Sequence, residues 1–246
     1  MKDWLKECEK DWDIEILFAC EAGSFAWGTN SSGSDYDVRF IYKRSIRSYL
    51  SLQKPMEVLD FDSPVDAHGW DLFKAFHLLS KSNPSIYEWA YSPIIYIDKH
   101  QFSLKLRNII EENYSTYSLT MHYYHLMKRN MDELSRKESL GTKEQKQLIQ
   151  ALRAFLIIRK IIENKQIIGG PYFEVKKNSD NIFERYYYQA VIAKQQEFIM
   201  EETKIKEVLS FLLSQKEGLA NQISSLGKKE PFTEELEGWL WELLGL

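Results

Sequence analysis

The stretch that decides the fold contains two apolar segments, Ile14-Glu-Ile-Leu-Phe-Ala-Cys20 and Asp37-Val-Arg-Phe-Ile-Tyr42. Short apolar runs bounded by turn residues are typical of buried β-strands. Glu21-Ala-Gly-Ser24 ends the first segment, and the turn-rich sequence Thr29-Asn-Ser-Ser-Gly-Ser34 precedes the second. We therefore predict two strands, with at most a turn or two of helix between them.

Chemically active residues lie at the ends of these two strands. Gly23-Ser24 is followed, ten residues later, by Asp35-Tyr36-Asp37. Residues i and i+2 of a strand project from one face about 7 Å apart, so Asp35 and Asp37 are expected to hold a hard cation, Mg²⁺ or Mn²⁺. The glycine lets backbone N–H groups approach a phosphate, and the Ser24 hydroxyl can hydrogen-bond to it. The pattern predicts metal-assisted phosphoryl or nucleotidyl transfer.

An Asp-x-Asp sequence also occurs in calcium loops and in nucleotide-sugar glycosyltransferases. A calcium loop does not fit, because Arg39 stands where the next ligand would be and no Asp/Asn-Gly follows. A glycosyltransferase would need a longer nucleotide-binding region than the 34 residues that precede Asp35. The upstream Gly-Ser favours the transfer site over both.

The spacing of Gly23-Ser24 and Asp35-x-Asp37 resembles the signature of the DNA polymerase β-like nucleotidyltransferase superfamily. The longer strings 21–28 and 34–42 resemble, more narrowly, a bacterial nucleotidyltransferase family associated with RNA ligases and RNA repair, and shorter matches continue to about residue 175. The resemblance implies an α+β fold, with a small mixed-sheet catalytic core over residues 1–117 and an all-helical region over residues 118–246. It also implies Mg²⁺-dependent transfer of a nucleoside monophosphate from an NTP to an acceptor hydroxyl.

The superfamily has a third carboxylate on a neighbouring strand, and two aspartates compete for that role. Asp66, in Pro64-Val-Asp-Ala-His-Gly-Trp70, is the better match, and it would complete the metal site or assist the acceptor. Asp71 is the alternative, but its place at the start of a helical pattern has an adequate structural explanation. The sequence departs from the family at Ala22, usually a small hydroxyl residue, and at Phe25, often arginine.

Two cations near the motif are candidate nucleotide-binding residues. By strand parity Arg39 lies on the face of the aspartates, where it either contacts the triphosphate or neutralises the carboxylates. Lys74, one turn into the next helix, either reaches phosphate or is a solvated helix charge. We interpret Trp27, Trp70 and Trp89 as packing residues rather than a base-stacking platform.

Beyond the motif the pattern becomes helical. Apolar spacing predicts helices over 70–80, 118–137 and 143–165, few breakers interrupt 183–215, and Thr233 begins a last helix over 233–243. The chain carries a net charge of −4, yet residues 118–177 contain 12 basic and 6 acidic residues. Such a segment could contact RNA, or be an ordinary solvated helix face. If RNA is the acceptor, we expect Arg153 and Lys160, which share one face of the second long helix, to contact it.

Composition restricts the class of protein. The 246 residues are 44% hydrophobic and 28% charged, which is typical of a globular chain. The apolar runs are too short for a membrane span, and the start resembles no signal peptide. Cys8 and Cys20 have no metal-ligand spacing, so we expect a cytoplasmic protein without disulfides. The sequence leaves three functions open: a nucleotidyltransferase acting on RNA, one acting on a protein or small molecule, and a silent nucleotide- or RNA-binding module.

Overall fold

A five-stranded sheet forms the first half of the chain in the computed structural model, which describes residues 1–137, 139–172 and 177–246. The strands are β1 (Glu15–Ala22), β2 (Asp37–Lys43), β3 (Val58–Phe61), β4 (Asp66–Asp71) and β5 (Ile95–Asp98). Their order is β3-β4-β2-β1-β5, with β2 and β4 parallel and the other neighbouring pairs antiparallel. The sheet is therefore mixed, as predicted.

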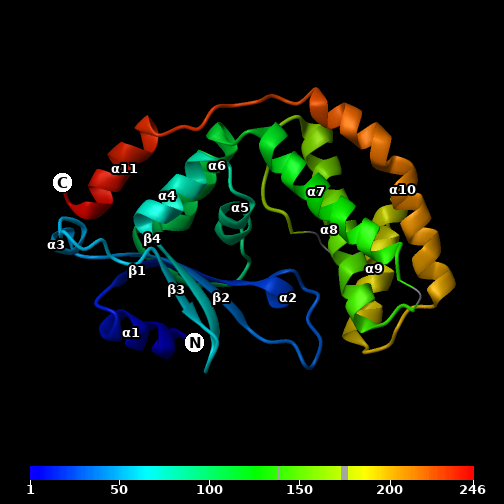
Figure 1. The fold of residues 1–246 in the computed structure, drawn as a ribbon, viewed down its shortest axis with the longest axis horizontal. Coiled ribbons are helices and arrows are strands. Elements are labelled where there is room, and N and C mark those ends of the chain that lie inside the picture. The colour runs from blue at the N-terminus through cyan, green and yellow to red at the C-terminus, as the bar shows by residue number, and fades with distance from the viewer. Residues whose placement is uncertain (138, 173–176) are drawn as a thin grey trace.

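Helices cover both faces of this sheet (Figure 1). The helices of the first half are α1 (Lys2–Asp11), α2 (Gly23–Ala26), α3 (Ile46–Tyr49), α4 (Leu72–Ser80), α5 (Pro84–Ala90) and α6 (Phe102–Asn113). On one face, Leu5 and Cys8 of α1 pack with Ile16 and Phe40. On the other, α4, α5 and α6 share one buried cluster with Leu17, Phe18 and Cys20 of β1. Because both faces are buried, the central strand reads as a continuous apolar run.

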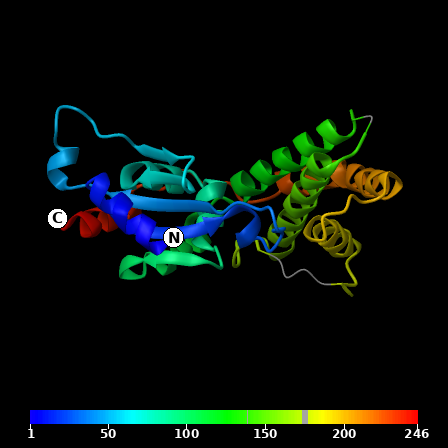
Figure 2. The same cartoon turned by 90° about the horizontal axis from the view of Figure 1, so that it is seen from below.

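A helical layer follows the sheet and extends away from it (Figures 1 and 2). Its helices are α7 (Thr116–Leu134), α8 (Thr142–Asn164), α9 (Ile182–Gln195) and α10 (Glu202–Ser224), and α11 (Glu234–Leu244) comes last. The α+β fold class is thus confirmed. No helix in the described ranges has the length and apolar content needed to cross a membrane.

Several boundaries differ from the sequence prediction because tertiary contacts set them. The region 183–215 is two helices, since Glu197 takes a left-handed conformation and the Met200 N–H donates to the buried Gln145 side chain. The predicted helix over 70–80 begins at Leu72, because Trp70 and Asp71 still belong to β4. The sequence reading missed α1, β5 and α6. The Asn83 side chain caps the next helix, α5, by accepting the Ser85 and Ile86 N–H groups.

The last helix returns to the first half of the chain. Figure 1 shows α11 beside α4, far from α10. The Trp239 ring lies 4.8 Å from Phe76 and 4.7 Å from Phe102 between centroids, and the Lys43 amino group donates to the Leu243 carbonyl at 2.7 Å. The division at residue 117 stays a prediction, and α11 belongs spatially with the sheet.

Candidate active site

Three strand ends meet at one edge of the sheet, and this edge carries the predicted motif. In the β1–β2 register Ala22 lies opposite Asp37, and in the parallel β2–β4 register Asp37 lies opposite Asp66. Gly23-Ser24 follows directly as the start of the short helix α2. Strand pairing therefore brings together residues from three separate parts of the sequence.

Gly23 is required at this edge by space as well as by backbone conformation. Its φ is +62°, a region that side chains disfavour, and a Cβ there would lie 1.8 Å from the Asp37 carboxylate oxygen Oδ2. The Asp37 carboxylate thus occupies the space that a side chain at residue 23 would need. The role that the sequence suggested for this glycine, letting phosphate approach the backbone, stays a prediction.

Replacing Gly23 with alanine is expected to displace the Asp37 carboxylate. The positive φ costs stability of about 1–2 kcal/mol, and misplacing a reacting group by about 1 Å can cost about 100-fold in rate. Gly28 is the matched control, because its φ is +64° but nothing lies within 4 Å of an added Cβ. Gly28→Ala should lower the melting temperature similarly and leave NTP binding intact. Equal NTP affinities for the wild type and both variants would contradict the inference that Gly23 leaves the space in which Asp37 is positioned for NTP binding.

Arg39 joins the two strand-end carboxylates. Its guanidinium lies 3.2 Å from Asp37 Oδ1 and 2.9 Å from Asp66 Oδ1. Of the two roles open to Arg39, these contacts favour neutralisation of the carboxylates. Asp35 precedes β2, is exposed, and has no ion pair with Arg39 among the described contacts.

A buried glutamate that the sequence reading did not select supports Asp37. Glu21 is fully buried, accepts the Asp37 backbone N–H at 2.7 Å and accepts the Tyr96 hydroxyl at 2.6 Å. Burial raises the pKa of Glu21, although these hydrogen bonds oppose the shift. The pKa of Asp37 is also raised, chiefly by burial; Arg39 opposes that shift, and the carboxylates of Asp66 and Asp35 add to it. A cation near Asp37 would relieve this repulsion.

The chemistry of the three aspartate side chains at this site fits a hard divalent cation. Asp35, Asp37 and Asp66 line one pocket, and carboxylate oxygens are the ligands that Mg²⁺ prefers. In the described part of the chain no three acidic, histidine or cysteine side chains lie close enough together to hold a metal ion, so these aspartates would have to move together around one. The Arg39 guanidinium, the cation present between Asp37 and Asp66, would have to withdraw from at least one of them.

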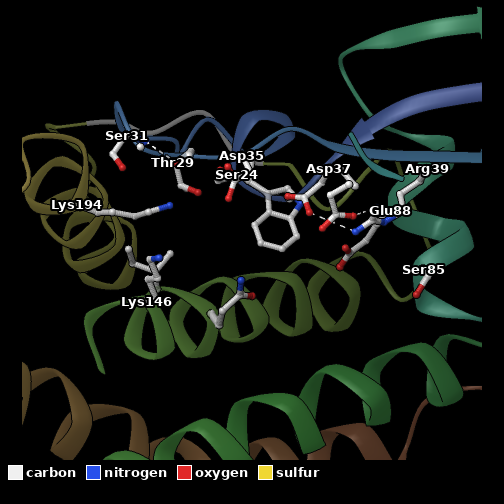
Figure 3. A pocket seen from close by; sticks show the side chains of 18 of the residues that line it. Ser24, Thr29, Ser31, Asp35, Asp37, Arg39, Ser85, Glu88, Lys146 and Lys194 are labelled. Carbon is white, nitrogen blue, oxygen red and sulfur yellow. Dashed lines mark hydrogen bonds and ion pairs between the residues drawn. The ribbon is translucent and has the colours of Figure 1, made fainter. Parts of the chain in front are cut away.

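The pocket beside these carboxylates has a volume of about 550 Å³ (Figure 3). Its near wall contains Gly23, Ser24 and the hydroxyls of Thr29 and Ser31. The far wall comes from helices distant in sequence, through Ser85, Glu88 and Trp89 of α5, Lys146, Ile149 and Gln150 of α8, and Lys194 of α9. The sequence reading missed this far wall, and the basic composition of 118–177 was the one signal that pointed toward Lys146.

Lys74 and Asp71 lie away from the pocket. Asp71 is the last residue of β4, at the opposite end of that strand from Asp66. It is buried, and its carboxylate accepts the Phe73 N–H at 3.0 Å and the Tyr49 hydroxyl at 2.9 Å. The helix-start interpretation of Asp71 is therefore confirmed. Lys74 follows it and lies 4.0 Å from Glu57, so the structure does not bring Lys74 together with the other candidates.

Arg153 and Lys160 do not form the solvent-facing surface that the spacing predicted. Arg153 is 2% exposed. Its guanidinium lies 2.8 Å from Glu88 Oε1 and 3.7 Å from the centre of the Trp27 ring. Lys160 is part-buried and donates to the Gly170 carbonyl at 2.9 Å. Arg153 packs against the first half of the chain and Lys160 is bonded to the loop after α8, so the expectation of a shared RNA-facing surface was wrong. The packing interpretation of Trp27, Trp70 and Trp89 agrees with these contacts and with the 4.0 Å stack of Trp70 on Trp89.

A mixed sheet with paired carboxylates beside a Gly-Ser turn is the arrangement of a polymerase β-like nucleotidyltransferase. Comparison with protein families gives the same class: the model described as "RlaP: RNA repair pathway DNA polymerase beta family" matches residues 1–242. The chain belongs to this family. It is also similar to the "Uncharacterized protein YcgL" of Bacillus subtilis (strain 168), with 29% identity over 194 residues and 74% of each chain covered.

Proposed function

We propose that this protein is a Mg²⁺-dependent nucleotidyltransferase, which moves a nucleoside monophosphate from an NTP to an acceptor hydroxyl. The observation that carries the proposal is the register of Asp37 opposite Asp66 at the strand edge that bears Gly23-Ser24. Asp35, Asp37 and Asp66 would hold the metal, and a metal bound there would neutralise charge that develops on the triphosphate. Gly23 and Ser24 would position the phosphates.

The acceptor oxygen would form a bond to the α-phosphorus, and the bond from that phosphorus to the bridging oxygen would break, so pyrophosphate leaves. Asp66 is proposed to accept the proton of the hydroxyl. Its place supports this role, because Asp66 lines both the pocket of Gly23-Ser24 and a second pocket of about 380 Å³. The protein's contribution would be positioning and charge neutralisation, as in other phosphoryl transfers.

Membership of a family named for RNA repair supports RNA as the acceptor. The second pocket favours another candidate, a protein or small molecule without a polyanionic backbone. Its wall carries the carboxylates of Asp60, Asp62 and Asp66, and the His68 ring that pairs with Asp60 and accepts the Trp70 N–H at 2.7 Å. Carboxylates repel phosphodiesters, and aromatic rings can stack on a base or a sugar.

The test is incubation of the protein with each labelled NTP and Mg²⁺ against pools of RNA, protein and small molecules. We expect label on one acceptor pool and release of pyrophosphate, both abolished by chelation of the metal. Release of pyrophosphate without labelling of any pool would contradict nucleotidyl transfer, and so would the absence of a reaction with any of the four NTPs. Label on RNA would select the first candidate, and label elsewhere the second.

Two aspartate variants separate a reacting carboxylate from a structural one. Asp66→Ala is expected to lower turnover by about 100-fold or more with little loss of NTP affinity, because general-base action matters mainly in the transition state. Asp71→Ala should instead remove a helix cap, lowering stability by about 1–2 kcal/mol with turnover retained. Steady-state kinetics and urea unfolding measure both. The reverse pattern would assign the reaction to Asp71.

A further inference from the structure

Two lysines of the helical layer lie on the far wall of the candidate active site. Lys146 belongs to α8 and Lys194 to α9, and both line the pocket that contains Gly23 and Ser24. In Figure 3 the two side chains lie at the end of the pocket near Thr29 and Ser31, and Asp37, Arg39 and Glu88 lie at the other end. The pocket therefore has a cationic, hydroxyl-lined end and a carboxylate end.

Among the described residues, the other cations at the pocket are already paired, whereas Lys146 and Lys194 are not. Arg39 is paired with Asp37 and Asp66, and Arg153 behind the wall is paired with Glu88. Over residues 1–137, 139–172 and 177–246, neither Lys146 nor Lys194 has an ion pair or hydrogen bond. Two ammonium groups thus line the pocket with no carboxylate of the described residues within ion-pair distance.

Holding these lysines together has an electrostatic cost. Burial, followed by the nearby charge of Lys146, lowers the pKa of Lys194. Lys146 lies in the second turn of α8, and the helix dipole, whose effect falls off within the first turn, gives it no compensating stabilisation. An anion between the two lysines would offset both the burial of Lys194 and the repulsion between the two charges.

Contacts across the pocket hold Lys194 in place. The next residue, Gln195, donates from its side chain to the Gly28 carbonyl at 3.0 Å, and Glu197 accepts from the Ser32 hydroxyl. These bonds tie the end of α9 to the segment that follows Ser24. The lysine end of the pocket is therefore built by both halves of the chain.

We propose that Lys146 and Lys194 bind the β- and γ-phosphates of the NTP, opposite Gly23-Ser24. This inference rests on the proposed function, because it assigns a substrate-binding role within the same site. A triphosphate fits better than an RNA backbone, since the pocket is bounded and its other end carries carboxylates. The helical layer would thereby complete the NTP site rather than serve only to hold the acceptor.

The test uses Lys146→Gln, Lys194→Gln and the double variant of the full-length chain. Glutamine keeps length and polarity but removes the charge, so melting temperatures should be unchanged or raised. Affinities are measured with ATP, GTP, CTP and UTP in turn, with the matching monophosphates, and with inorganic tripolyphosphate. Each substitution should weaken NTP and tripolyphosphate binding about tenfold, from the loss of a charged hydrogen bond, and weaken monophosphate binding less than NTP binding.

Two controls make the result specific. Lys143→Gln, one turn earlier on α8 and outside the pocket lining, should leave every affinity unchanged, and Lys194→Arg should keep most of the tripolyphosphate affinity. Unchanged NTP and tripolyphosphate binding in the double variant would overturn the proposal, and so would a loss of monophosphate binding as large as the loss of NTP binding. If tripolyphosphate binding depends on the lysines but no NMP is transferred, this inference stands and the proposed function fails.

Discussion

Replacing both Asp35 and Asp37 with asparagine is expected to abolish Mg²⁺-dependent NTP binding and nucleotidyl transfer. Each aspartate supplies anionic oxygen to the same pocket, and asparagine keeps the shape but removes the charge that holds a divalent cation. We expect activity to fall by about 1,000-fold or more, the scale of removing a principal electrostatic group. Isothermal titration with Mg²⁺ and each NTP, followed by transfer assays, measures the loss.

The same double variant should fold at least as well as the wild type. The pKa of Asp37 is raised, so its ionised form is less favourable in the folded than in the unfolded chain, and neutralising it removes that cost at neutral pH. Arg39 keeps Asp66 as a partner at 2.9 Å. A melting temperature well below that of the wild type would mean that loss of binding reflects unfolding, and wild-type NTP and Mg²⁺ binding would refute the metal-site assignment.

Replacing Arg153 with methionine is expected to lower the free energy of unfolding by about 3 kcal/mol, the range found when one partner of a buried ion pair is removed. The change leaves Glu88 without its cation and removes the guanidinium from the Trp27 ring, 3.7 Å away. Urea unfolding measures the effect. Because Arg153 lies between α8 and the first half of the chain, NTP affinity should fall as well.

Two further variants show whether the Arg153 effect comes from the buried pair. Adding Glu88→Gln to Arg153→Met should recover part of the loss, because no unpaired carboxylate then remains and the amide oxygen still accepts the Tyr123 hydroxyl. Arg159→Gln on the same helix breaks a surface pair with Glu163 and should cost less than about 0.5 kcal/mol. Equal losses at Arg153 and Arg159 would exclude a special role for the buried pair.

Local pattern was sufficient for the centre of the fold. Residues 14–20 and 37–42 have the short apolar runs of buried strands, and they form β1 and β2 because burial on both faces favours such runs. The Gly-Ser and Asp-x-Asp spacing predicted that Gly23, Ser24, Asp35 and Asp37 gather, and these four residues do line one pocket. These residues lie at or beside strand ends, so short-range geometry nearly defines their places.

Tertiary structure decided what sequence spacing left ambiguous. Asp66 and Asp71 begin and end the same strand, and only the parallel register with β2 puts Asp66 beside Asp37. On α8 the residues that follow Ile149 are largely buried, so helical periodicity did not show which cation faces inward. Arg153 is enclosed by Trp27 and Glu88, whereas Lys146 faces the pocket. A helical pattern defines which residues share a face, but the partner packed against that face determines whether it is buried, and here that partner lies more than 50 residues away in the sequence.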